Sequence, residues 1–132
     1  MKYLLSLYGD ESGWDDVTPE EMRAAMGPWN EFERRAFDAG VKLAGEGLQP
    51  SSTATTVKVG EGDDRAVTDG PFAETKEQLG GFYLLECKDL DEALEWAKKV
   101  PLRPGGSIEV RPVMDYTQYG YDDPNLKAST AG

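Results

Sequence analysis

The chain has 132 residues, 39% of them hydrophobic and 30% charged, which is enough for one domain with one core. Its formal net charge of −11 argues against direct nucleic-acid binding, because that binding depends on Lys and Arg residues that neutralise phosphates. No apolar run approaches the roughly 20 residues of a membrane-spanning helix, and residues 1–8 are too short and too polar for a signal peptide. We therefore expect a cytoplasmic protein that does not contact membranes.

Histidine is absent from the sequence, and Cys87 is the only cysteine. An internal disulfide and a cysteine-based zinc site are therefore excluded. Any acid–base chemistry has to use carboxylates, Lys or Tyr, because the commonest general base is missing. The acidic loops lack the alternating ligand spacing of a calcium-binding loop, so the sequence predicts neither a metal nor a cofactor. Cys87 ends an apolar stretch, and we expect its thiol to be buried and inert.

A strand and a helix are predicted at the start of the chain. Residues 3–8 mix Leu and Tyr and read as a buried strand. Thr18 at the N-cap, Pro19 at the first helical position and Glu21 three residues after the cap predict the start of a helix. Pro28 lies inside the apolar pattern of that helix and is expected to kink it or split it in two.

Three strands are predicted to follow the helix. Residues 41–48 form the second strand, in which glycines allow close approach of another group. The β-branched residues 53–59 predict a third strand. Residues 65–68 predict a short fourth strand that pairs back on the third as a hairpin.

A tight turn and a charge cluster then fill residues 68–82. The turn Asp69-Gly70-Pro71 fixes the backbone, because Asp bonds its own backbone, Gly adopts positive φ and Pro sets φ to about −65°. Gly80 and Gly81 lead into the most apolar strand, residues 81–87, which we expect to be central. This segment is the first place to look for a site.

The last elements are a second helix, a final strand and a tail. Asp89 is the predicted N-cap of the helix, and Glu92 completes its capping box. Apolar and polar residues alternate over residues 107–113, which predicts a strand. We expect residues 1–114 to form one domain, and residues 115–132 to be a polar tail or an arm that docks on a partner.

The order of the elements predicts an α+β fold, a ferredoxin-like βαββαβ sandwich with an inserted β-hairpin and both helices on one face of an antiparallel sheet. Residues 3–8 and 82–86 place apolar side chains on both faces of that sheet. A bare apolar face of this size marks an interaction surface. We therefore expect a homodimer whose two sheets face each other and enclose a cavity.

The tetrapeptide Asp69-Gly70-Pro71-Phe72, with the acidic and Gly-Gly-Phe residues behind it, resembles the DGPF subgroup of the YCII-related family. Residues 45–48, 90–93 and 107–113 resemble the same family, so the likeness covers roughly residues 1–114. The resemblance implies a ferredoxin-like subunit of the dimeric α+β-barrel group. It implies no particular reaction, since members are associated with enzymatic activity, with small-ligand binding or with alternative sigma factors.

The sequence departs from this family at two positions. Many members carry a His in the first helix and an Asp just before a Pro after the second helix, proposed as a dyad in a cleft. Trp29 occupies the position of that His, and Val100 occupies the position of that Asp. A His–Asp mechanism therefore does not carry over to this chain. Trp29 is instead expected to floor a cavity as a packing or stacking group.

Five residues are candidates for ligand binding: Trp29, Glu46, Asp69, Phe72 and Glu74. Glu46 lies between two glycines. Either it forms an acidic pair with Asp69, or Gly45 and Gly47 mark a bulge and Glu46 faces water. Asp69 and Glu74 either point into the cavity, with Lys76 as their charge partner, or belong to a turn that has only a structural role. In that second interpretation Asp69 caps backbone amides, Phe72 plugs the core and Glu74 is solvated.

Two functions are compatible with these features. The first is a small-molecule-binding protein with a cavity at a homodimer interface; as an enzyme it would use Glu46 or Asp69 as a base of raised pKa in an apolar site. The second is a regulatory module that binds a protein, such as a sigma factor, through its acidic surface or tail. Whether the protein is an enzyme stays open on the sequence alone.

Overall fold

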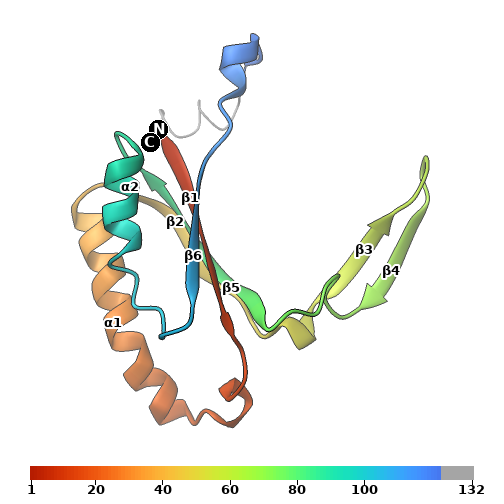
Figure 1. Ribbon diagram of the computed structural model, residues 1–132, viewed down its shortest axis with the longest axis horizontal. Coiled ribbons are helices and arrows are strands. Elements are labelled where there is room, and N and C mark those ends of the chain that lie inside the picture. The colour runs from red at the N-terminus through yellow and green to blue at the C-terminus, as the bar shows by residue number, and fades with distance from the viewer. Residues whose placement is uncertain (123–132) are drawn as a thin grey trace.

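The structure is a computed structural model that describes residues 1–122, apart from the side chain of Asp15. Two helices lie on one face of a four-stranded antiparallel sheet, and a separate two-stranded hairpin projects from the other side (Figure 1). This is the ferredoxin-like α+β arrangement that the sequence predicts. Of the predicted tail, residues 123–132 lie outside the described part. Within residues 1–122, no helix combines the length and apolar character needed to cross a membrane.

The four-stranded sheet has the order β2-β5-β1-β6, and all neighbouring strands are antiparallel. Its strands are β1 (Lys2–Asp10), β2 (Lys42–Gly47), β5 (Glu77–Glu86) and β6 (Ser107–Pro112). The central position predicted for residues 81–87 is confirmed. β5 begins before the predicted strand and contains a bulge at Gly80, because Leu7 pairs with Gly81 whereas Tyr8 pairs with Leu79.

The helices are α1 (Pro19–Asp38) and α2 (Leu90–Ala97), and both begin at the predicted caps. Thr18 Oγ1 accepts a hydrogen bond from the backbone N–H of Glu21 at 3.1 Å. Asp89 Oδ1 accepts one from the backbone N–H of Glu92 at 2.9 Å. α1 continues through Pro28, so the predicted split does not occur. This stretch of the helix is exposed, and water can bond the carbonyl that loses its backbone donor.

The core lies between the helices and one face of the sheet. β1 contributes Tyr3, Leu5 and Leu7, and β5 contributes Tyr83 and Leu85. The helices add Phe32, Ala36, Ala93 and Ala97. The predicted burial of Cys87 is confirmed, since the residue is 2% exposed. Burial, followed by the charge of Glu92, raises the pKa of the Cys87 thiol to about 11.

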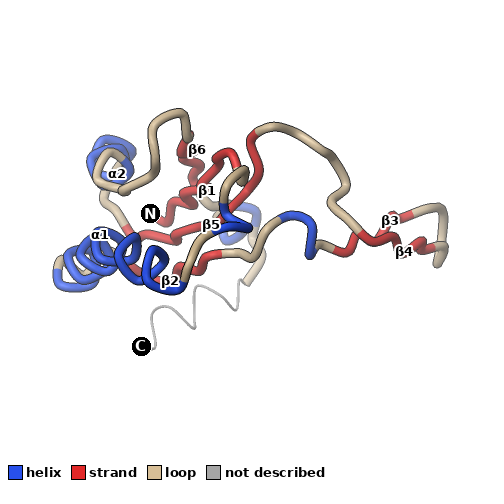
Figure 2. Tube along the Cα trace, turned by 90° about the horizontal axis from the view of Figure 1, so that it is seen from below, coloured by secondary structure: helices blue, strands red, loops and turns tan. Residues whose placement is uncertain are grey.

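The hairpin consists of β3 (Thr55–Val59) and β4 (Arg65–Asp69), paired as the sequence predicts. It stands away from the sheet, on the side opposite the helices, in both views of the chain (Figures 1 and 2). Every residue of β4 is exposed, and so is every residue of β3 except Thr56. At its base the N–H of Gly70 donates to the carbonyl of Ala54 at 2.7 Å, and the Thr56 hydroxyl donates to the carbonyl of Gly70 at 2.7 Å.

Candidate functional site

The second face of the sheet carries apolar side chains that neither helix covers. Leu4, Phe82 and Leu84 alternate with the core residues of β1 and β5 and therefore lie on this face. Each of the three is half-buried in the single chain, whereas Ser6 between them is 8% exposed. We call this surface the open face, and it comprises Leu4, Ser6, Tyr8, Leu79, Phe82 and Leu84.

Charged side chains surround the open face on all four strands. They are Lys2, Asp10, Glu46, Glu77, Glu86, Glu109 and Arg111. These are five acidic and two basic groups, in a chain that has 25 acidic and 14 basic residues. Glu109 and Arg111 also pair with each other, at 2.8 Å between Oε1 and Nε. The six residues of the open face are therefore uncharged, whereas the groups around them are mainly acidic, most of all at the end where Asp10 lies opposite Glu77.

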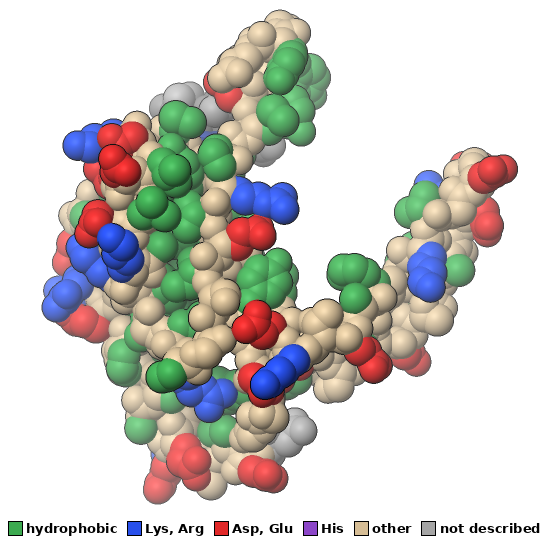
Figure 3. Space-filling view, viewed as in Figure 1, with side chains coloured by type: hydrophobic (Ala, Val, Ile, Leu, Met, Phe, Trp, Pro, Cys, Tyr) green, Lys and Arg blue, Asp and Glu red, His purple; other side chains and the backbone are tan. Residues whose placement is uncertain are grey.

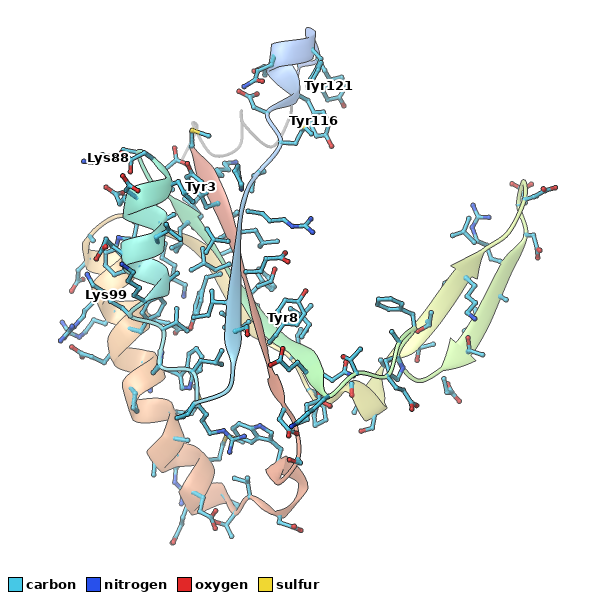
Figure 4. All side chains as sticks on the ribbon, in the orientation of Figure 1. Tyr3, Tyr8, Lys88, Lys99, Tyr116 and Tyr121 are labelled. Atoms are coloured by element: carbon cyan, nitrogen blue, oxygen red, sulfur yellow. The ribbon has the colours of Figure 1, made fainter. Side chains whose placement is uncertain are left out.

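The open face forms one wall of a hollow in the molecule, and the hairpin stands across that hollow (Figure 3). Labelled side chains distinguish the two sides of the sheet, with Tyr3 on the helix side and Tyr8 toward the hairpin side (Figure 4). Tyr116 and Tyr121, which follow β6, also point away from the helices (Figure 4) and have ring centroids 6.1 Å apart. Apolar and aromatic groups from three regions thus lie around one hollow.

A polar groove of about 370 Å³ lies at the end of the open face, beside the base of the hairpin. Asp10 is two residues beyond Tyr8 on β1 and therefore shares its face of the sheet. The groove is lined by Asp10, Glu11, Ser12, Ser51, Ser52, Pro71, Glu74, Thr75, Lys76 and Gln78. Carboxylates, hydroxyls and an ammonium group meet here, so the groove offers both donors and acceptors to a polar ligand.

Hydrogen bonds hold two walls of this groove together. Glu11 accepts hydrogen bonds from the backbone N–H of Ser51 at 2.8 Å and from the Ser51 hydroxyl at 2.6 Å. Asp10 accepts one from the backbone N–H of Ser12 at 2.8 Å. The backbone and hydroxyl bonds from Ser12, followed by the charge of Lys76, lower the pKa of Asp10. The Asp10 carboxylate is therefore charged at neutral pH.

The structure distributes the predicted candidates over several regions. Glu74 lines the groove, and Phe72 lies in the adjoining loop with 86% of its surface exposed. Glu46 lies opposite Phe82 at the edge of the open face, and Asp69 ends β4 at the base of the hairpin. The alternative in which Phe72 plugs the core is wrong, because its ring faces solvent.

Trp29 is separated from the other four candidates by the sheet. It packs on the core side, where its ring stacks on that of Tyr83 with centroids 6.5 Å apart. The Tyr83 hydroxyl donates a hydrogen bond to Glu33 at 3.0 Å. Burial and this bond raise the pKa of Tyr83. Val100, the second position that departs from the family dyad, is buried in the same core.

The backbone between the hairpin and β5 changes direction at glycines. Gly70 has a φ of 102°, in the left-handed region that favours glycine. Gly81 is buried, and a Cβ there would lie 2.8 Å from the backbone oxygen of Glu46. β2 and β5 therefore approach closely at the position where Glu46 flanks the open face.

Sequence reasoning missed most of the groove. Asp10, Ser12 and Ser51 were not candidates, because they come from separate segments that no local spacing connects. The one local signal is the Asp-x-Ser spacing of residues 10–12, which is typical of a side chain that bonds the backbone two residues later. That signal predicts a turn but does not predict a binding site.

Comparison with known proteins places the chain in a family. The family model of the YCII-related domain matches residues 1–117, so the chain belongs to this family. An uncharacterized protein of Rhizobium meliloti (strain 1021) is 41% identical over 118 residues, which cover 88% of this chain and 94% of that protein. Neither description names a ligand or a reaction, so the function has to be argued from the geometry.

Proposed function

We propose that this protein binds a small molecule in a cavity that two copies enclose between their open faces. The observation that carries the proposal is an apolar sheet face that leads directly into a polar groove. Ligand sites combine these two features, with an apolar lining for most of the ligand and a few polar groups that fix its orientation.

The two regions define the chemistry of the ligand. Phe82, Leu84 and Tyr8 suit an aromatic ring or a short apolar chain, which gains free energy when it leaves water. At the groove end, the carboxylates of Asp10 and Glu74 accept hydrogen bonds, and serine hydroxyls both donate and accept. We therefore infer a ligand with an apolar body and an amine- or hydroxyl-bearing end.

In this proposal a second copy supplies the cover that residues 1–122 do not provide. The six residues of the open face are uncharged, so two copies can meet through this centre while the charged groups around it stay in contact with water. The same contact would exclude water from the apolar end of the ligand. A catalytic role for Glu46 or Asp69 depends on this contact, because both residues are exposed in the single chain.

The test is ligand binding to the intact protein, screened with small aromatic and short-chain amines and alcohols by thermal shift. Compounds that raise the melting temperature are then titrated against Glu74→Gln, with Glu20→Gln on α1 as the matched control. We expect Glu74→Gln to weaken binding roughly tenfold or more, since a charged acceptor is replaced by a neutral amide oxygen, which accepts a weaker hydrogen bond. We expect Glu20→Gln to bind like the wild type.

The proposal is contradicted if no compound of this class raises the melting temperature, or if both variants bind every hit equally well. The alternative function, recognition of a basic protein partner through an acidic surface, stays a prediction. The described surface favours it least at the centre of the open face, whose six residues carry no charge.

A further inference from the structure

The hairpin exposes a row of valines. Val57 and Val67 pair across its two strands, and Val59 lies two residues further along the same face. These three side chains are between 55% and 71% exposed. We call them the valine face. The other face of the hairpin carries Thr56, Lys58, Ala66 and Thr68.

A valine-rich face opposite a more polar face is typical of a strand pair that is covered on one side. A two-stranded hairpin on its own is marginally stable in water, and β-branched residues stabilise strands chiefly when they pack against a neighbour. Within residues 1–122 the three valine side chains have little cover, since they are between 55% and 71% exposed. An apolar strand face of this kind marks an interaction surface.

We propose that a second copy of this chain covers it, so that each hairpin acts as an arm that packs its valine face on the partner. This proposal rests on the proposed homodimer and deepens it. The arm starts beside the polar groove and stands across the hollow from the open face (Figures 1 and 3). A copy seated on the open face therefore comes within reach of the arm, which would close the side of the cavity.

The charge distribution favours a second copy over another partner. Two chains that each carry a net charge of −11 repel one another unless they meet through neutral surfaces. The six residues of the open face carry no charge. The valine face is balanced in charge, because Arg65 lies opposite Val59 and Asp69 lies opposite Thr55. A basic partner would instead be attracted to the acidic remainder of the surface.

The first experiment measures amide hydrogen exchange in β3 and β4 of the intact protein over a dilution series. We expect the exchange of these amides to slow at least tenfold as the protein concentration rises through the dimer range. The Leu84→Lys variant, which places a charge on the open face, should show the fast rate at every concentration. Exchange that does not depend on concentration in the wild type would overturn the arm proposal.

The second experiment identifies the chain that the arm contacts. A photo-crosslinking amino acid at position 57 is placed in unlabelled protein, which is mixed with ¹⁵N-labelled wild-type protein and irradiated. We expect mixed ¹⁴N–¹⁵N crosslinks from position 57 and at least fivefold fewer from position 58, which lies on the other face of the hairpin.

The outcomes separate the two proposals. A dimer whose position-57 crosslinks all fall within one chain overturns the arm and leaves the cavity between the open faces standing. A monomer at all concentrations overturns both. A Val57→Lys/Val67→Lys variant that is folded but dimerises at least tenfold more weakly supports the arm, and unchanged dimerisation in that variant contradicts it.

Discussion

At the scale of single residues, Tyr83 joins α1 to the sheet. Its ring contacts Phe32 with centroids 5.0 Å apart, and its hydroxyl donates to Glu33. The ring has room only because position 45 on the neighbouring strand is glycine. A Cβ there would lie 2.6 Å from Tyr83 Cε1 and closer still to Cδ1. The Gly-Glu-Gly sequence of β2 thus has a packing role beside any role in ligand binding.

We predict that Gly45→Ala destabilises the fold by about 1–3 kcal/mol, because the ring is held by three partners and cannot move freely. Gly47→Ala on the same strand is the matched control, since a Cβ at Gly47 would meet no atom within 4 Å. The control should change stability by no more than about 0.5 kcal/mol. Urea unfolding of both variants measures the difference, and equal losses would show that the close approach is not the cause.

The thiol of Cys87 predicts a dependence of stability on pH. Its folded pKa of about 11 lies above the ordinary thiol value of about 8.5. The unfolded thiol therefore ionises first as the pH rises, so the contribution of Cys87 to stability is complete below about pH 8.5 and is lost as the pH rises toward 11. We expect the melting temperature of Cys87→Ala to fall less steeply than that of the wild type between pH 8.5 and 11. Parallel curves would contradict this assignment.

The environment of a residue was predictable where it depends on nearby sequence. Cys87 follows an apolar strand, and its burial follows from that strand being central. Phe72 shows the opposite case. An aromatic ring between a proline and an acidic segment gives no local indication of its environment, and the structure exposes it because the loop beside the hairpin base leaves the core.

At the scale of elements, the caps were the most reliable signals. The side chains of Thr18 and Asp89 each accept a hydrogen bond from the backbone N–H three residues later. Four consecutive residues are therefore sufficient to predict this interaction. Pro28 was less informative. The free-energy cost of a proline inside a helix depends on whether water can reach the backbone carbonyl that loses its hydrogen-bond donor. That depends on tertiary packing, which leaves this half of α1 exposed.

We predict that Asp89→Ala destabilises the protein by about 1 kcal/mol, since the backbone N–H of Glu92 loses its acceptor. Asp91→Ala is the control in the first turn of the same helix. It removes a charge near the helix N-terminus without removing the cap, and should cost about 0.3–1 kcal/mol. Thermal unfolding at low and high salt separates the two, because only the Asp91 effect should weaken strongly with salt. Two equally salt-sensitive losses would contradict the capping role.

The hairpin illustrates the limit of prediction at this scale. Its two strands and its turn were predicted from β-branched residues and glycines, and the pairing of Val57 with Val67 agrees. Its projection away from the sheet was not predicted, because the direction of a hairpin depends on the segments at its base. Those segments bring Ser51 to Glu11 and Gly70 to Ala54, contacts that no periodicity indicates.

At the scale of the whole molecule, the sequence was sufficient for the architecture but not for the groove. The order of strands and helices limits the topologies to a few, and the observed β2-β5-β1-β6 sheet is one of them. The groove requires three separate segments to meet, and their side chains are polar residues that loops commonly carry. Only the three-dimensional structure shows that Asp10 and Glu74 line one space.

The open face leads to a prediction about the assembled protein. Leu84→Lys should abolish the proposed dimer but leave the fold intact, because the side chain lies on the face away from the core. Circular dichroism should show unchanged secondary structure. A variant that unfolds would show instead that Leu84 stabilises the single chain, and Leu4→Lys would then repeat the test at the paired position.

Sedimentation equilibrium of the wild-type protein at about 10 μM tests the central claim most directly. The proposed homodimer predicts a species of twice the chain mass of 14.5 kDa, since exposed apolar faces mark interaction surfaces. A stable species of 14.5 kDa at that concentration would contradict the account, because neither the enclosed cavity nor the contact of the arm with a partner can exist in a single copy.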